Sequence, residues 1–183
     1  MATVSMPQDA AESDALYEVV NGEIVENAPM GTYQIRLAFR LAYFLESFLE
    51  QTGLGISLTE GLFDFTAQIG NKRRPDVAFV SKDRWPRNMP IPDTEAWDVV
   101  PDLAVEVISS TNSAREIVTK INEYFQVGVE RVWVVYPSHR QFYVYTSPTE
   151  LRILSDRDEL VDEALFPGFR LPLSTLFDDT ARG

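Results

Sequence analysis

The chain has 183 residues, of which 45% are hydrophobic and 11% aromatic, so it is long enough and apolar enough to bury one sizeable core. The absence of cysteine excludes disulfides and thiolate metal sites, and a single histidine, His139, excludes histidine-rich zinc sites. The net charge of -12 argues against a broad basic surface for nucleic acid. Any bound metal is therefore expected to be held by carboxylates, whose oxygen atoms favour Mg²⁺ or Mn²⁺.

The N-terminal segment and the apolar runs carry no membrane signal. Residues 1–14 lack the basic start and apolar centre of a signal peptide. No apolar run approaches the roughly 20 residues that span a bilayer. We expect a cytoplasmic protein with no membrane partner, in which residues 1–15 form a disordered leader and residues 16–183 a single domain.

The first structured region is predicted to be a β-hairpin followed by a long helix. Asn21-Gly22 stands between two short runs of β character in residues 17–26, which is a strong hairpin signal. Residues 31–51 then place apolar side chains around more than half of a helical circumference. We expect such a helix to be covered by the sheet and by a second subunit, which makes the protein a homodimer.

The middle of the chain is predicted to be mainly β structure. Residues 56–69 read as strand with an interruption near Gly61, and residues 71–74 read as a polar turn. A short strand is expected over residues 75–81. Residues 82–101 contain four prolines and predict a long loop, and long ordered loops are often functional.

Residues 101–128 combine an apolar strand, a polar loop and a helix with clear ends. Ser113 and Glu116 have the S-x-x-E spacing of a capping box, and Gly128 stands where a helix commonly ends in a left-handed turn. Lys120 is expected at the edge of the apolar face of this helix. The residues predicted to form that face are Ile117, Val118, Ile121, Tyr124 and Phe125.

Two strands each carry one carboxylate with a small neighbour on the same face. Alternation places Asp76 with Ala78, and Glu106 with Ala104. If the strands are adjacent, the alanines leave room for an ion and a substrate. The alternative is that both carboxylates are solvated near strand ends or pair with nearby Arg or Lys side chains, because an unpaired buried carboxylate is costly.

The last third of the chain predicts three strands at hairpin spacing, beginning near residues 132, 141 and 150. Residues 165–177 are interrupted by proline and predict an extended cover with a short final helix. The whole order indicates an α/β or α+β fold with a mixed sheet and helices packed against it.

The motifs RRPDVAFVS and PDLAVEVISS, a helix with Lys120 and Tyr124, and GVERVWVVYP follow one another in this chain. This series resembles the Uma-two family of restriction endonucleases, which belongs to the PD-(D/E)XK nuclease superfamily. The resemblance covers about residues 16–177 and includes the opening LYEVVNGEIVE. It implies a restriction endonuclease-like core, with a mixed central β-sheet flanked by helices and an N-terminal β-hairpin.

The resemblance also implies a set of catalytic residues. Asp76 and Glu106 match the carboxylates that bind Mg²⁺ or Mn²⁺. The superfamily usually places a lysine two residues after the second carboxylate, where this chain has Ile108. In the Uma-two pattern the lysine comes from the following helix, at Lys120.

Two further residues are implied as accessory to the site. Tyr124 follows Lys120 by four residues, as in the Q-x-x-x-Y helix motif of related nucleases. Glu23 matches a recurrent acidic position of the hairpin, with a solvated turn residue as the alternative.

The function implied is Mg²⁺-dependent endonuclease hydrolysis of phosphodiester bonds in DNA. Lys72, Arg73 and Arg74 form the local basic patch expected to contact phosphates weakly. Two alternatives stay open: a catalytically silent binding or regulatory module with the nuclease fold, and a dimeric interaction protein.

Overall fold

A six-stranded mixed sheet forms the centre of the protein, for which a computed structural model describes residues 15–86, 88–178 and 180. Its strands lie side by side in the order β10 (Leu151–Ser155), β9 (Gln141–Tyr145), β8 (Arg131–Tyr136), β7 (Leu103–Val107), β6 (Val77–Ser81) and β3 (Gly55–Thr59). β7 and β8 are parallel, and the other neighbouring pairs are antiparallel. The parallel pair is joined by helix α3 (Ala114–Val127), as a parallel connection requires a crossover.

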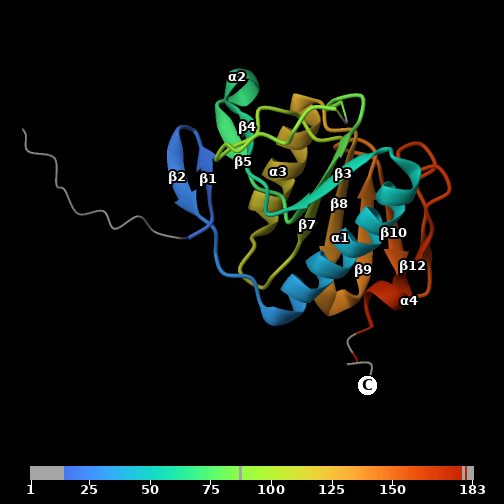
Figure 1. Cartoon of the computed structure of the whole chain (residues 1–183). Helices are drawn as coiled ribbons and strands as arrows, with labels where there is room; N and C mark the ends of the chain where they lie inside the picture. Colours follow the sequence, from blue (N-terminus) through green and yellow to red (C-terminus); the bar gives the residue numbers. More distant parts are fainter. Residues whose placement is uncertain (1–14, 87, 179, 181–183) are drawn as a thin grey trace, which may run out of the picture.

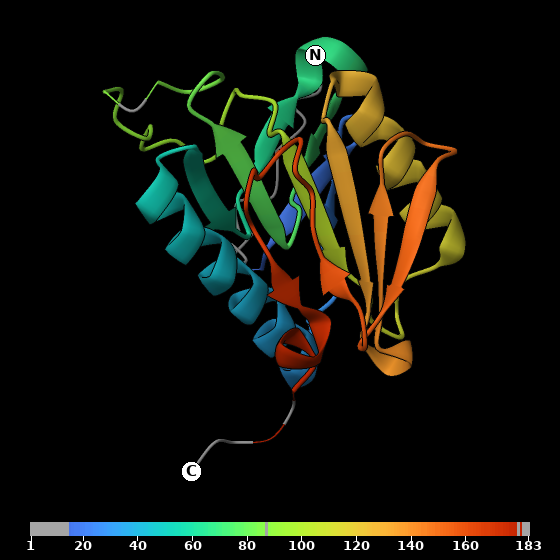
Figure 2. The same cartoon turned by 90° about the vertical axis from the view of Figure 1, so that its right-hand side faces the viewer.

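Two helices cover opposite faces of this sheet (Figure 2). Helix α1 (Thr32–Thr52) packs on the face that carries Val77, Phe79 and Val105, whereas α3 packs on the face that carries Ala78 and Ala104. The predicted alternation in both strands is therefore confirmed, and the small side chains lie on the α3 side. The mixed α+β fold expected from the sequence is also confirmed.

The N-terminal hairpin belongs to a second sheet of four strands, in the order β2-β1-β5-β4. The strands are β1 (Tyr17–Val20), β2 (Glu23–Glu26), β4 (Phe63–Phe65) and β5 (Asn71–Arg73). Asn21 and Gly22 both have positive φ, 53° and 80°, as the predicted tight hairpin turn requires. Figure 1 shows this small sheet at one side of the molecule, next to α3.

Two local predictions in this region are wrong. Residues 71–73 form strand β5 instead of a polar turn, because their backbone pairs with β1 and β4 and the side chains of Asn71 and Arg73 find buried polar partners. Thr66–Ile69 forms the short helix α2 instead of strand. The Asp64 carboxylate accepts a hydrogen bond from the backbone N–H of Thr66 (2.9 Å), which favours a helical start at that point.

Helix α3 has the predicted ends. The Ser113 hydroxyl accepts a hydrogen bond from the backbone N–H of Glu116 (3.1 Å), and Gly128 has φ 98° and closes the C-terminus. The predicted apolar face needs one correction, because Val118 is 57% exposed. Lys120, expected at the edge of that face, is buried.

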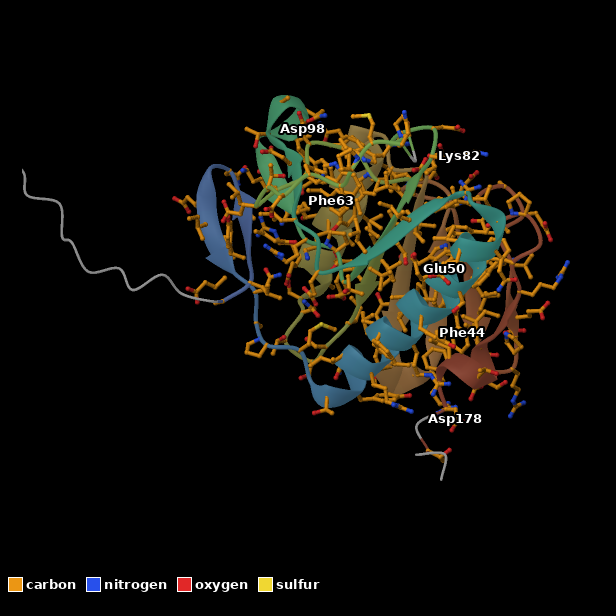
Figure 3. The ribbon with its side chains drawn as sticks, viewed as in Figure 1. Phe44, Glu50, Phe63, Lys82, Asp98 and Asp178 are labelled. Atoms are coloured by element: carbon orange, nitrogen blue, oxygen red, sulfur yellow. The ribbon has the colours of Figure 1, made fainter. Side chains whose placement is uncertain are left out.

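The C-terminal segment covers the α1 face of the sheet. It contains β11 (Glu159–Leu160), β12 (Leu171–Pro172) and helix α4 (Leu173–Leu176), while η1 (Pro137–His139) joins β8 to β9. Buried aromatic side chains such as Phe166 and Phe177 fill the space beneath this cover. Figure 3 shows side chains packed throughout the interior of the protein. Phe63 lies in this interior, whereas Lys82 lies at the outer edge. The extended cover and short final helix are confirmed.

No helix among the described residues combines the length and apolar character needed to cross a membrane. The predicted leader lies almost wholly outside the described residues, since residues 1–14 are not described. The division into leader and single domain therefore stays a prediction.

Candidate functional site

The Asp76 carboxylate is fixed by the backbone of β7 on both sides of Glu106. The backbone N–H of Asp76 donates to the carbonyl of Val105 (3.0 Å), and the N–H of Val107 donates to Asp76 Oδ2 (2.5 Å). These bonds hold Asp76 directly before the first residue of β6, where it and Glu106 line the same cavity. The sequence expectation that the two strands are adjacent is thus confirmed by the pairing of β6 with β7.

Both carboxylate oxygens of Glu106 accept hydrogen bonds from α3. Lys120 Nζ lies 3.1 Å from Oε2 and 3.4 Å from Oε1, and the Tyr124 hydroxyl donates to Oε1 at 2.7 Å. Lys120 and Tyr124 are four residues apart, so they project from the same side of the helix. All three side chains are buried. The helix therefore contributes the partners that make a carboxylate tolerable in the interior.

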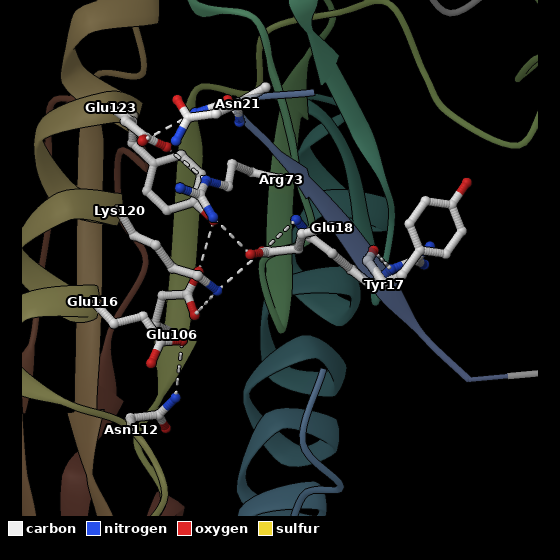
Figure 4. A network of polar contacts seen from close by, with 12 residues as sticks. Tyr17, Glu18, Asn21, Arg73, Glu106, Asn112, Glu116, Lys120 and Glu123 are labelled. Carbon is white, nitrogen blue, oxygen red and sulfur yellow. Dashed lines mark hydrogen bonds and ion pairs between the residues drawn. The ribbon is translucent and has the colours of Figure 1, made fainter. Parts of the chain in front are cut away.

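Lys120 has a second carboxylate partner, Glu18 from strand β1. Its Nζ lies 3.0 Å from Glu18 Oε1, so the ammonium stands between the hairpin and the central sheet (Figure 4). Burial lowers the pKa of Lys120, but pairing with Glu106 and Glu18 outweighs burial and holds the pKa above its ordinary value. The lysine is therefore cationic at neutral pH.

Asp76, in contrast, lies in surroundings that oppose its charge. Burial and then the negative charge of Glu106 raise the pKa of Asp76 to about 8, although its bond to the Val107 N–H acts in the opposite direction. Burial also raises the pKa of Glu106 and of Glu60, a residue at the same cavity. The cavity thus holds more carboxylates than its cations neutralise.

This donor set suits a hard divalent cation. Carboxylate oxygens are the ligands that Mg²⁺ and Mn²⁺ prefer, and added positive charge would relieve the repulsion between Asp76 and Glu106. Within the described part of the chain, no group of three or more His, Cys, Asp or Glu side chains is arranged to hold a metal ion. An ion bound by Asp76 and Glu106 would therefore need backbone carbonyls, water or substrate as its other ligands.

The cavity has a volume of about 360 Å³ and opens beside the connection between the hairpin and α1. One wall is polar and contains Glu60, Arg74, Asp76, Glu106 and Lys120. Apolar residues also line the cavity, with Pro29 and Met30 from the connection and Ile35 from the first turn of α1. This combination of apolar lining and converging charged groups is typical of a ligand site.

The sequence matches the Uma2 family, described as "Putative restriction endonuclease", over residues 4–174. The chain belongs to the Uma2 family.

The fold is also similar to a known crystal structure from Anabaena variabilis, described as "a putative nuclease belonging to DUF820". The two chains share 16% identity with a TM-score of 0.76, over 88% of this chain and 89% of the other. At that level of identity the likeness supports the fold alone. No curated protein matches the chain significantly.

The structure brings together four of the residues that the Uma2 resemblance implied: Asp76, Glu106, Lys120 and Tyr124. Glu23 lies elsewhere, exposed at the start of β2 and opposite Val20. It does not line the cavity.

The predicted basic patch is divided by the fold of this Uma2 protein. Lys72 pairs with Asp64 at 3.1 Å, away from the cavity. Arg73 is buried and bonds Glu18 and Glu123, so its guanidinium does not form part of a basic surface for phosphates. Only Arg74 of the three lines the cavity. The physical reason is strand alternation, which turns Arg73 inward and its two neighbours to the other face.

Sequence reasoning missed Glu18 and Glu60. Glu18 carried a usable signal, because it is a carboxylate within a short strand of otherwise uncharged residues, as Glu106 is. Glu60 carried none: it reaches the cavity from a turn with φ 56°, next to the backbone of Asp76, and that proximity is tertiary.

Proposed function

We propose that this protein is a metal-dependent nuclease whose catalytic residues are Asp76, Glu106 and Lys120. The observation that carries the proposal is the meeting of two strand carboxylates and one buried lysine at a single cavity. Membership of the Uma2 family and the nuclease-like fold support the reaction class.

Asp76 and Glu106 would hold Mg²⁺, which supplies a polarised water and neutralises phosphate charge when it is bound. Lys120 retains its proton at neutral pH, so its role is to donate a hydrogen bond to a phosphate oxygen as charge develops there. Tyr124 orients Glu106 through the 2.7 Å hydrogen bond. Arg74, at the same cavity, is placed to attract the phosphate backbone, which makes binding sensitive to salt.

The test is cleavage of plasmid DNA by the purified protein with Mg²⁺, with chelator, and after Asp76→Ala. We expect cleavage that requires Mg²⁺ and falls at least ~100-fold in the variant, because a metal ligand is lost. Glu23→Ala is the matched control, since it removes an exposed carboxylate of the same chain. Equal rates for the wild type and Asp76→Ala would assign the cleavage to a contaminant.

A catalytically silent binding module is the second candidate. It is favoured by the fact that Lys120 and Tyr124 already occupy both oxygens of Glu106. The two candidates differ in metal binding, which the silent module does not require. Titration with Mn²⁺, followed by paramagnetic broadening of NMR signals near Asp76, separates them.

A further inference from the structure

Glu18 is a buried carboxylate on β1 that makes three polar contacts. It accepts hydrogen bonds from Arg73 Nη1 (2.8 Å) and from the backbone N–H of Arg74 (2.9 Å), and it pairs with Lys120 Nζ (3.0 Å). Figure 4 shows Glu18 reaching from the hairpin toward Lys120, whereas Tyr17 points to the other side of β1. The metal-binding carboxylates implied by the resemblance, Asp76 and Glu106, do not include this residue, and its partners are all cationic or N–H groups.

The neighbouring strand β5 ties β1 to α3 at a second place. Arg73 Nε bonds Glu123 on α3 (2.6 Å), and the Asn71 side-chain amide donates to the same carboxylate (3.1 Å). Asn71 in turn accepts a hydrogen bond from the backbone N–H of Asn21 in the hairpin turn (2.7 Å). This chain of contacts fixes the position of β1 relative to the helix that carries Lys120.

A lysine needs such a constraint if its tip is to stay in one place. The side chain has a flexible four-carbon stem, and a single ion pair with Glu106 would leave the ammonium free to move along that carboxylate. Glu18 supplies a second contact from the other side. Burial alone would raise the pKa of Glu18, but Lys120, the Arg74 N–H and Arg73 together lower it, so Glu18 keeps its charge.

We propose that Glu18 is a positioning residue, which holds the Lys120 ammonium at the cavity wall beside Glu106 and acts on the substrate only through that lysine. The proposal rests on the proposed function in one respect, the action of Lys120 in hydrolysis. It makes the N-terminal hairpin a working part of the site. It also separates the role of Glu18 from that of Asp76 and Glu106.

The first test needs no enzyme activity. The chain contains three lysines, Lys72, Lys82 and Lys120, so NMR of protein labelled at the lysine ε-carbon gives three signals. We expect the Lys120 signal to be the most restricted in the wild type and to approach the mobility of exposed Lys82 in Glu18→Gln. An unchanged Lys120 signal in that variant would overturn the proposal, even if the protein cleaves DNA.

The second test compares rates with a matched network variant. Glu18→Gln should lower kcat by roughly 10- to 100-fold with KM little changed, because small misplacement of a reacting group has effects of that size. Glu18→Asp, which keeps the charge, should recover part of the rate. Glu123→Gln breaks the same network without touching Lys120. If Glu18 served only as a structural anchor, both Gln variants would lose activity in proportion to their loss of Tm.

Metal affinity completes the test. A positioning residue does not touch the metal, so the Kd of Glu18→Gln for Mn²⁺ should stay within about threefold of the wild-type value, which is well under the 1.4 kcal/mol of a tenfold change. A loss greater than tenfold would make Glu18 a metal ligand and overturn the proposal. If Glu18→Gln does not fold, the same measurements on Glu18→Asp test the proposal. In Glu18→Asp the NMR signal of Lys120 must change while the affinity for Mn²⁺ does not. If the mobility of Lys120 depends on Glu18 but the protein does not cleave DNA, the proposed nuclease function is refuted and the positioning role of Glu18 is not.

Discussion

The charged residues of the cavity fall into two groups with opposite electrostatic behaviour. The surroundings of Lys120 stabilise its charged form, because two carboxylates lie within 3.1 Å of its Nζ. The surroundings of Asp76 destabilise its charged form, because burial and the negative charge of Glu106 both raise its pKa. The fold therefore retains one carboxyl group whose ionised form lowers the stability of the folded protein. Strongly perturbed groups of this kind cluster at functional sites.

Asp76 gives a prediction about stability and pH. Because its folded-state pKa is about 8 against 3.8 ordinarily, the folded protein loses stability as pH rises from about 4 to above 8. Asp76→Asn removes this loss, so in the presence of chelator it should stabilise the protein by several kcal/mol at pH 9, at about 1.4 kcal/mol for each unit of pKa shift, and little at pH 4. Denaturant unfolding across this pH range measures the difference. A constant difference at all pH values would contradict the assignment.

Lys120 gives a prediction about where the catalytic ammonium is rooted. Lys120→Ala should abolish cleavage and also lower stability by about 3 kcal/mol, because it leaves buried Glu106 without a cation and Glu18 with Arg73 alone. Metal binding should be largely retained.

Ile108 offers the rescue, since it follows Glu106 by two residues, and its side chain packs with the apolar cluster on the α3 side of the sheet. Ile108→Lys added to Lys120→Ala should restore part of the rate. Cleavage at the wild-type rate in Lys120→Ala alone would reduce Lys120 to a structural role.

At the scale of elements, α3 is the part that assembles the site. It connects the parallel strands β7 and β8, packs its apolar residues on the sheet face that carries Ala78, Ala104 and Val132, and presents Lys120 and Tyr124 to Glu106. The hairpin then closes the site from the opposite side through Glu18.

The corrected apolar face of α3 can be tested by two substitutions. Ile121→Ala should lower the free energy of unfolding by about 3 kcal/mol, because it leaves a cavity in the core. Val118→Ala should change it by less than about 0.5 kcal/mol, since Val118 is mostly exposed. Chemical denaturation of the two variants gives the comparison. Similar losses of unfolding free energy for both variants would mean that Val118 belongs to the apolar face of α3, as periodicity alone predicts.

The whole molecule exposes an apolar stripe along α1. Ile35, Phe39 and Tyr43 are 54%, 66% and 60% exposed and recur every four residues. We propose that a second copy of the chain covers this stripe. An antiparallel pairing of two α1 helices centred on Tyr43 would place exposed Arg36 of one copy opposite exposed Glu50 of the other, because both lie seven residues from the centre.

This dimer predicts the effect of a single charge. Phe39→Glu should shift the protein from dimer to monomer at micromolar concentration, because the stripe would then bury an unpaired carboxylate. Light scattering measures the mass. Ile153→Glu is the control, since Ile153 is similarly exposed but lies on β10, at the far edge of the sheet from β3. A wild-type mass of one chain would refute the proposal.

Local sequence determined the elements whose signals are contained within a few residues. The Asn21-Gly22 turn, the cap at Ser113, the stop at Gly128 and the alternation around Asp76 and Glu106 all depend on neighbours in sequence, and all are present in the fold. The family pattern added the order of the motifs, and that order alone singles out Lys120, on the helix that follows the second carboxylate.

Contacts between distant segments decided the rest. Strand β5 exists because β1 and β4 flank it, and Arg73 is buried because Glu18, 55 residues away, and Glu123, 50 residues away, neutralise it. Lys120 likewise turned from a residue expected at the helix edge into a buried cation between two carboxylates. A side chain's charge state and exposure depend on which segments fold against it, and periodicity along one helix or strand does not contain that information.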